Sequence, residues 1–105
     1  MAVDVEVFHR DCEILDPAGA ISPLVVTFYS PLKNPHGGDY LARANISCRF
    51  FDKDVYGTGE DAPQAFFSLP MAVVSYLIGQ RRYGYEAYWS EQGDLDYKDF
   101  WIYLE

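Results

Sequence analysis

Apolar residues recur at steps of three, four and seven between Asp61 and Gly84, and this spacing predicts the one long helix of the chain. Two flanking apolar residues widen the stripe into a broad face that would pack on the rest of the domain. The members of this face are Phe66, Phe67, Pro70, Val73, Val74, Leu77 and Ile78, with Arg81 in the same periodic series at its end. The other elements are therefore expected to form a sheet that covers this helix.

Signals at both ends of this stretch support a helix. Asp61 stands three residues before Gln64, a spacing that lets the two side chains bind orphan backbone N–H groups. Gly84 follows two arginines at the other end, where a left-handed residue commonly ends a helix. Pro70 should kink or divide the helix, because proline has no N–H to donate. Gly79 is expected to allow a close approach of the helix backbone to the sheet.

Alternation of apolar and polar residues predicts three strands before the helix, at residues 3–14, 24–29 and 40–50. The first changes parity along its length, so a bulge is expected near Arg10–Asp11. The third is the most regular, and one of its faces would be apolar. That face consists of Tyr40, Ala42, Ala44, Ile46, Cys48 and Phe50.

Residues 52–59 are expected to connect the third strand to the helix, and two more strands should follow Gly84 around a turn at Ser90–Asp96. The last strand would place Phe100, Ile102 and Leu104 on one face. The predicted order is βββαββ within a single domain, residues 1–105. This is an α+β fold, an antiparallel sheet covered on one face by one long helix.

The charge balance limits the classes of partner. Sixteen acidic residues against eight basic ones give a net charge of −8, which disfavours binding to nucleic acid or anionic lipid and favours a basic protein partner or plain solubility. No unbroken apolar run approaches the roughly 20 residues that span a bilayer. The acidic N-terminus does not resemble a signal peptide, so a cytoplasmic protein is expected.

Residues that could carry chemistry form no complete group. His9 and Cys12 have a possible metal-ligand spacing, but no second pair follows. Gly57-Thr58-Gly59 could hold an anion before the helix, and the loop from His36 to Asp39 could carry an acid–base pair. The first lacks the lysine of a phosphate-binding loop, and a glycine-rich turn needs no catalytic role. We therefore predict no catalytic residue, no metal site and no cofactor.

The C-terminal hairpin is the most suggestive surface, because acids alternate there with tyrosine and tryptophan. Such rings are typical of interface cores, and surrounding acids would steer a basic partner toward them. The predicted contact residues are Trp89, Glu91, Asp94, Asp96, Tyr97, Asp99 and Trp101. The alternative is that these rings pack on the far side of the sheet as a minor core.

The middle of the chain resembles a family of small bacterial proteins, domain of unknown function 6968. The resemblance rests on Gly37-Gly38-Asp39, the strand to Phe50, Tyr56-Gly57 and the run Gly59–Phe66. It ends at Pro70 and implies no functional residues, because its motifs are a turn and a helix cap.

In size, acidity and fold class the chain is also similar to immunity proteins of bacterial toxin systems, including contact-dependent growth inhibition. That likeness implies a non-enzymatic inhibitor of a basic toxin domain such as a nuclease. Two alternatives stay open. One is a homo-oligomer that buries its open sheet face, and the other is a small-molecule binder or minor enzyme that uses the His36–Asp39 loop.

Overall fold

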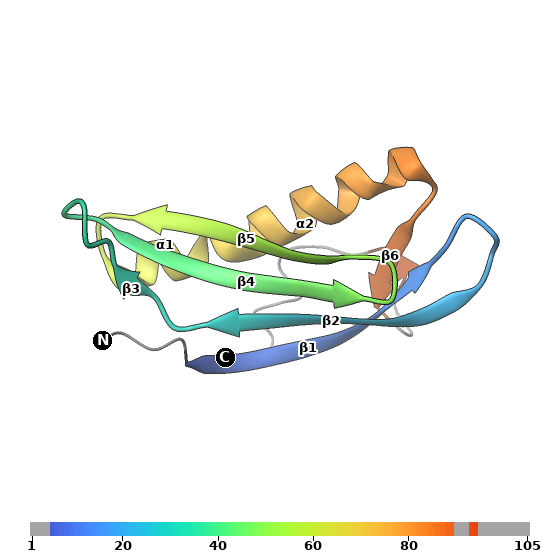
Figure 1. The fold of residues 1–105 in the computed structure, drawn as a ribbon, viewed down its shortest axis with the longest axis horizontal. Coiled ribbons are helices and arrows are strands. Elements are labelled where there is room, and N and C mark those ends of the chain that lie inside the picture. The colour runs from blue at the N-terminus through green and yellow to red at the C-terminus, as the bar shows by residue number, and fades with distance from the viewer. Residues whose placement is uncertain (1–4, 90–92, 95–105) are drawn as a thin grey trace.

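The computed structural model describes residues 5–89 and 93–94, with only the backbone at Trp89, Gly93 and Asp94. Within this part the chain forms an antiparallel sheet and one interrupted helix (Figure 1). The strands are β1 (Glu6–Leu15), β2 (Ile21–Tyr29), β3 (Leu32–Lys33), β4 (Tyr40–Cys48), β5 (Asp52–Gly59), β6 (Glu86–Trp89) and β7 (Gly93–Asp94). The helical segments are α1 (Ala62–Phe67), α2 (Leu69–Gly79) and the 3₁₀ turn η1 (Gln80–Tyr83).

The strands pair in the order β5–β4–β2–β1–β6–β7, and the short β3 also pairs with β4. All of these pairings are antiparallel. The helix runs along one side of the sheet, and the other side carries no helix among the described residues (Figure 1). The predicted α+β class, with one helix covering one face of an antiparallel sheet, is confirmed.

The core lies between the helix and the sheet, on the faces that the alternation predicts. Leu24, Val26 and Phe28 of β2 are completely buried. The Phe28 ring stacks on Phe8 with centroids 4.7 Å apart, and Phe66 of α1 packs against both rings. The apolar face of β4 and the inner positions of the helix complete this core. Their buried members are Ala42, Ala44, Ile46, Ala65, Leu69, Val73, Val74 and Leu77.

The helix begins and ends close to its sequence signals. The backbone N–H of Gln64 donates to Asp61 Oδ1 at 2.8 Å, and Gln64 Oε1 accepts from the Glu60 N–H at 2.6 Å. Gly84 ends η1 with a φ of 90°, the left-handed conformation expected of it. The helix divides at Ser68, two residues before Pro70, so that the proline stands in the first turn of α2. In that position no intrahelical N–H is required of it.

Strand β5 is the main departure from the prediction, which treated residues 52–59 as a connection. It pairs with β4 from Tyr40↔Gly59 to Ser47↔Asp52. Glycine and aspartate are poor strand formers by composition, and they obscured the alternation here. Gly57 and Gly59 face α1, where an added Cβ would lie 2.6 Å from the Ala65 carbonyl oxygen and 2.5 Å from its nitrogen, respectively. Glycine is therefore required for the helix to pack this closely.

Further differences concern exposure and register. The register of β1 shifts between Glu6 and Phe8, so the bulge expected near Arg10–Asp11 lies earlier in the strand. Gly79 does not allow a close approach, since an added Cβ would meet nothing within 4 Å. Phe67 and Ile78, assigned by sequence to the packed stripe, are 58% and 48% exposed. They lie on the outer side of the helix, because their angular positions around the helix axis point away from the sheet.

The C-terminal hairpin is described only in part. β6 pairs with β7 at Tyr88↔Asp94 and Trp89↔Gly93, so strand pairing resumes inside the span 90–96 that the sequence assigned to a turn. The predicted last strand, with Phe100, Ile102 and Leu104, lies outside the described residues.

Candidate functional site on the open face of the sheet

The side of the sheet without a helix is defined by strand register. His9, Asp11 and Glu13 of β1 lie opposite Thr27, Val25 and Pro23 of β2. Across β4 the same face continues through the pairs Arg43↔Tyr56, Asn45↔Asp54 and Ser47↔Asp52. Side chains alternate between the two sides of a strand, and the alternate set packs on the helix, so all of these point away from it. We call this surface the open face.

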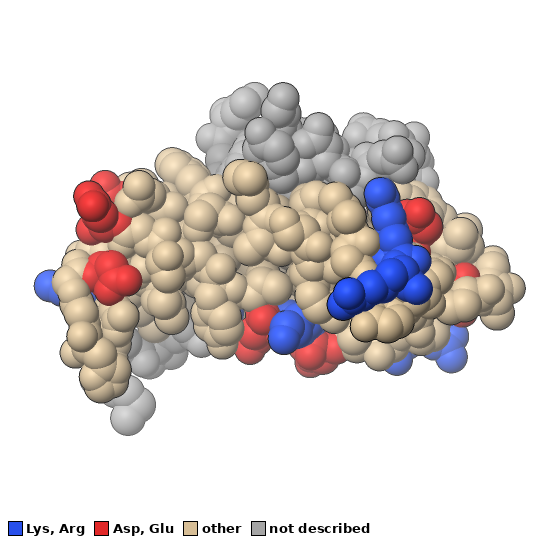
Figure 2. Space-filling view, turned by 90° about the horizontal axis from the view of Figure 1, so that it is seen from above, with Lys and Arg blue, Asp and Glu red and all other residues tan. Residues whose placement is uncertain are grey.

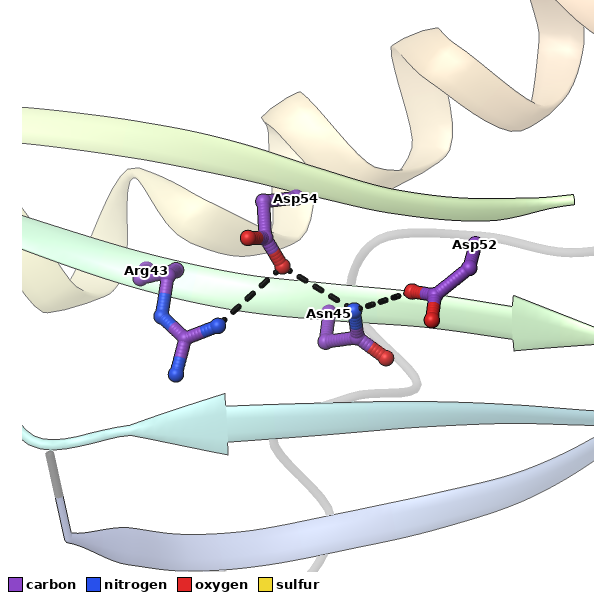
Figure 3. Close-up of polar contacts among 4 residues, drawn as sticks. All are labelled: Arg43, Asn45, Asp52 and Asp54. Atoms are coloured by element: carbon purple, nitrogen blue, oxygen red, sulfur yellow. Dashed lines mark hydrogen bonds and ion pairs between the residues drawn. The ribbon is translucent and has the colours of Figure 1, made fainter.

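A hydrogen-bonded cluster occupies the β4–β5 part of the open face (Figure 3). The Asn45 side-chain amide donates to Asp52 Oδ1 at 2.6 Å and to Asp54 Oδ1 at 2.9 Å. The Arg43 guanidinium donates to Asp54 Oδ1 at 3.2 Å and lies 4.0 Å from the centre of the Tyr29 ring. The positive charge of Arg43 is therefore engaged within the protein, and the carboxylates keep fixed positions.

The balance of charge on the open face is negative. Its carboxylates belong to Glu6, Asp11, Glu13, Asp52 and Asp54. The strand register places two basic side chains on the same face. Arg43 is paired with Asp54, and His9 Nδ1 lies 3.5 Å from Glu6 Oε2. Alternate residues of one strand are about 6.8 Å apart, so Asp11 and Glu13 on β1 and Asp52 and Asp54 on β5 form two acidic pairs, with the uncharged positions of β2 and the Asn45 strand β4 between them.

Aromatic and apolar surface lies at the Tyr56 end of the open face, beyond Asp54. Tyr56 on β5 is 54% exposed. Beside it is a hollow of about 240 Å³, lined by Ser30, Leu32, Leu41, Ala42, Arg43 and Tyr56. Tyrosine next to a shallow hollow is typical of a protein-binding surface, because the ring supplies apolar area and a polar tip. The arrangement suits a partner that carries positive charge and an anchoring side chain.

The predicted contact residues connect to this face through the hairpin. Tyr88 of β6 lies opposite Glu13 of β1, and Asp94 of β7 lies opposite Tyr88. Asp94 is therefore in register, through Tyr88, with Glu13 of the open face. Trp89 is one position further along β6 and pairs with Gly93. The remaining predicted contacts are outside the described residues: Glu91, Asp96, Tyr97, Asp99 and Trp101.

Sequence reasoning missed the open face of β5, with Asp52, Asp54 and Tyr56, because it treated this segment as a connection. A signal was present. Asp52, Asp54 and Tyr56 alternate with Lys53 and Val55 at the period of a strand. Gly57 and Gly59, which follow in the same segment, were interpreted as signs of a loop, and the alternation was disregarded.

The cysteines are placed for packing. Cys12 and Cys48 lie on either side of Leu24 in adjacent strands, so their backbones are about 10 Å apart, too far for a disulfide. Burial raises the pKa of the Cys12 thiol to about 12, which removes its nucleophilic character near neutral pH. His9 is on the open face and Cys12 on the helix side, so these two residues cannot share a metal ion. Within the described ranges, no group of three or more His, Cys, Asp or Glu side chains could hold one.

The two loop candidates also have structural roles. Gly57-Thr58-Gly59 belongs to β5, where its glycines contact α1, and is not an anion-binding loop. In the loop before β4, Asp39 Oδ1 accepts from the Asn34 side-chain amide at 3.1 Å, and Asn34 Oδ1 accepts from the backbone N–H of His36. These bonds close a turn between β3 and β4.

The stretch Ala62–Tyr83 is long and apolar enough to cross a membrane by length and composition alone, and it is the one such stretch in the described part of the chain. The amino-acid sequence had predicted no membrane span. Leu69, Val73 and Leu77 of this stretch are buried. Comparison with family models, with curated proteins and with solved structures finds no match to this chain.

Proposed function

We propose that this chain is an immunity protein that binds and neutralises a basic bacterial toxin domain, such as a contact-dependent-inhibition nuclease. The observation that supports this proposal is the open face, where β1 and β5 carry carboxylates and the exposed Tyr56 lies two residues beyond Asp54. A nuclease binds its substrate through positive charge directed at phosphates. An ordered array of carboxylates can occupy the same groove and exclude the substrate.

The cluster around Asn45 favours this inhibitory role, because it holds two carboxylates ready for a partner. Asp52 and Asp54 are both fixed by the same amide group, so little side-chain entropy is lost when they bind. Tyr56 and the hollow beside it would accept an anchoring side chain, which prolongs the complex once it has formed. The proposal places the protein in the cytoplasm, where Cys12 and Cys48 stay reduced.

The test uses the toxin domain encoded beside this gene. Equimolar chain should abolish the toxin's activity, and association measured by surface-binding kinetics should slow as salt is raised. Reversing Asp11, Glu13 and Asp52 to Lys should slow association by about tenfold or more. The matched control is Glu60→Lys, an exposed acid next to the helix and off the open face, which should leave the rate unchanged.

A second pair of variants separates anchoring from steering. Tyr56→Ala should speed dissociation with little change in association, because the ring is an anchor and not a charge. The reversal Asp94→Lys tests whether the hairpin extends the same surface. A toxin that stays fully active with excess chain would show that the proposal is wrong. Equal binding by all open-face variants would move the interface to another surface.

A further inference from the structure

The outer side of the helix is uncharged, although a surface helix normally carries charged residues there. Residues 62–79 include no Asp, Glu, Lys or Arg. Phe67, Met71 and Ile78 on this side are 58%, 61% and 48% exposed. A solvent-facing stripe of a domain helix is normally charged or polar, so this uncharged stripe with three exposed apolar side chains is a candidate contact surface.

Charges of opposite sign stand at the two ends of this stripe. Glu60 and Asp61 precede the helix, and Arg81 and Arg82 follow it, all four of them exposed. Figure 2 shows acidic side chains at one end of the molecule, a group of basic side chains with acidic ones beside them toward the other, and a band of uncharged residues between the two ends above a mixed charged edge. A second copy of the helix, packed antiparallel, would place its basic end beside the acidic end of the first helix and its acidic end beside the basic end.

We propose that two copies of this chain form a two-fold dimer by packing these helices antiparallel, with Met71 near the two-fold axis. Residues equidistant from Met71 then face each other across the axis. Phe67 faces the partner's Ser75, and Gln64 faces the partner's Ile78. Every residue in these pairs is exposed in the single chain, and the steps of three and four between them keep them on one side of the helix.

The same symmetry brings the charged ends together. Glu60 faces the partner's Arg82, and Asp61 faces the partner's Arg81. Arg81 already donates to Glu86 at 3.0 Å and Arg82 lies over the Tyr83 ring, which holds both guanidinium groups at the helix end. A parallel arrangement would instead place like charges at each end, so the charges select the antiparallel one.

A membrane surface is the less suitable occupant. Helices that lie on membranes carry Lys and Arg along their polar side and are attracted to anionic lipid. Here the charges are confined to the ends, two of them are acidic, and the net charge of the chain is −8. A second copy offers opposite charges to both the acidic and the basic end of the helix, whereas an anionic lipid surface attracts only the basic end.

The length of the stripe sets the expected affinity. Twenty-two helical residues span about 33 Å, and helices pack about 8–10 Å apart, so the contact is narrow. Interfaces at the small end of the range bind weakly, and we expect a dissociation constant on the order of 10–100 µM. The dimer uses the exposed side of the helix and not the open face of the sheet, so it does not depend on the proposed function and leaves the open face available.

Sedimentation of the purified chain from about 1 µM to about 1 mM tests the proposal. The chain should pass from monomer to dimer over this range. Met71→Glu places like charges at the axis and should weaken the dimer by 100-fold or more. Ile21→Glu, which changes an apolar residue of similar exposure on β2, should leave it unchanged. Circular dichroism checks that each variant is folded.

A charge exchange tests the antiparallel register itself. Arg82→Glu should weaken the dimer about tenfold, and adding Glu60→Arg to the same chain should restore it, because the pair is then reversed. Met71→Cys should cross-link to its own copy under mild oxidation, whereas Ile21→Cys should not. A monomer at every concentration, a dimer that tolerates Met71→Glu, or a failure of the double exchange would each overturn the proposal. Vesicle binding by a monomeric chain, lost in Met71→Glu, would assign the stripe to a membrane.

Discussion

The two sides of the same sheet differ in what holds their side chains in place. On β2, Leu24, Val26 and Phe28 point toward the helix and are completely buried, while Val25, Thr27 and Tyr29 alternate with them on the open face and are only half-buried. The helix side is fixed by dense apolar packing. The open face is fixed by hydrogen bonds and charge, with Asn45 at the centre of its cluster.

This difference separates stability from recognition. Burying one large apolar side chain contributes about 1.5–3 kcal/mol, whereas a surface ion pair such as Arg43–Asp54 contributes about 0–1 kcal/mol. The helix side should therefore carry most of the free energy of folding. The open face can change its charges with little effect on the fold, which is what a surface that adapts to a partner requires.

The largest expected effect is on the helix side. Phe28→Ala should lower the free energy of unfolding by about 3–5 kcal/mol, because it removes a buried ring stacked on Phe8 and leaves a cavity. The matched control is Thr27→Ala, the neighbouring residue on the open face, which should cost less than about 1 kcal/mol. Chemical denaturation of both variants measures the difference. Equal losses would show that the two sides are not distinct in stability.

The pH dependence of stability provides a second test of the helix side. The pKa of Cys12 is about 12 in the folded chain, against an ordinary value of 9.0, because burial disfavours the thiolate. The unfolded chain therefore loses its proton first as pH rises, and stability should fall from about pH 9 to about pH 12 by about 1.4 kcal/mol per pH unit. Below pH 9 this group has no effect.

Cys12→Ala separates this contribution from other groups that titrate at high pH. The variant should be less stable at pH 7 because it loses buried volume, and its stability should decline less steeply above pH 9. A thiol reagent at pH 8 should leave Cys12 unmodified in the folded chain. Rapid modification of Cys12 under these conditions would contradict its burial.

Two glycines provide the next test, since one is packed and the other is not. Gly57→Ala should cost about 1–3 kcal/mol, because the new methyl group would meet Ser68 and the backbone of Ala65 in α1. Gly79→Ala has open space around it and should stabilise α2 by about 0.5–1 kcal/mol. Thermal denaturation of both variants decides the comparison. The same sign of change in both would contradict the close approach of α1 to β5.

How far the sequence predicts this fold depends on how local each signal is. The cap at Asp61, the left-handed Gly84 and the alternation on β4 were all read correctly, because each depends on neighbouring residues alone. Strand β5 was missed because its glycines are required by contact with α1, a contact between separate elements. The position of the bulge in β1 depends in the same way on its pairing with β2.

The candidate site shows the same limit. The composition indicated an acidic, aromatic surface, which sequence reasoning placed in the C-terminal hairpin. Most of that hairpin lies outside the described residues, so this placement stays a prediction, whereas the open face was not predicted. Asp11, Asn45 and Asp54 belong to three different strands, and only the register places them on one face. A single strand shows its two faces in its alternation. Which strands are neighbours, and which face the helix covers, depends on long-range pairing that no local pattern records.

The smallest expected effect concerns the carboxylates of the open face. Asp54→Asn removes the ion pair with Arg43 and should lower the free energy of unfolding by about 0.5–1 kcal/mol at low salt. The change should shrink in about 1 M salt, where exposed charges are screened. Asp52→Asn is the matched control, since Asp52 is exposed and its carboxylate accepts from Asn45, so its effect should stay within about 0.5 kcal/mol.

These two variants also test whether the open face is built for a partner or for the fold. Both remove one negative charge from the same strand, so each should slow association with a basic partner to a similar degree although their effects on stability differ. Denaturant titrations at two salt concentrations, paired with binding kinetics, measure the two quantities separately. A loss above about 2 kcal/mol in Asp54→Asn would mean that the cluster around Asn45 stabilises the fold, and the division of roles between the two sides would then be wrong.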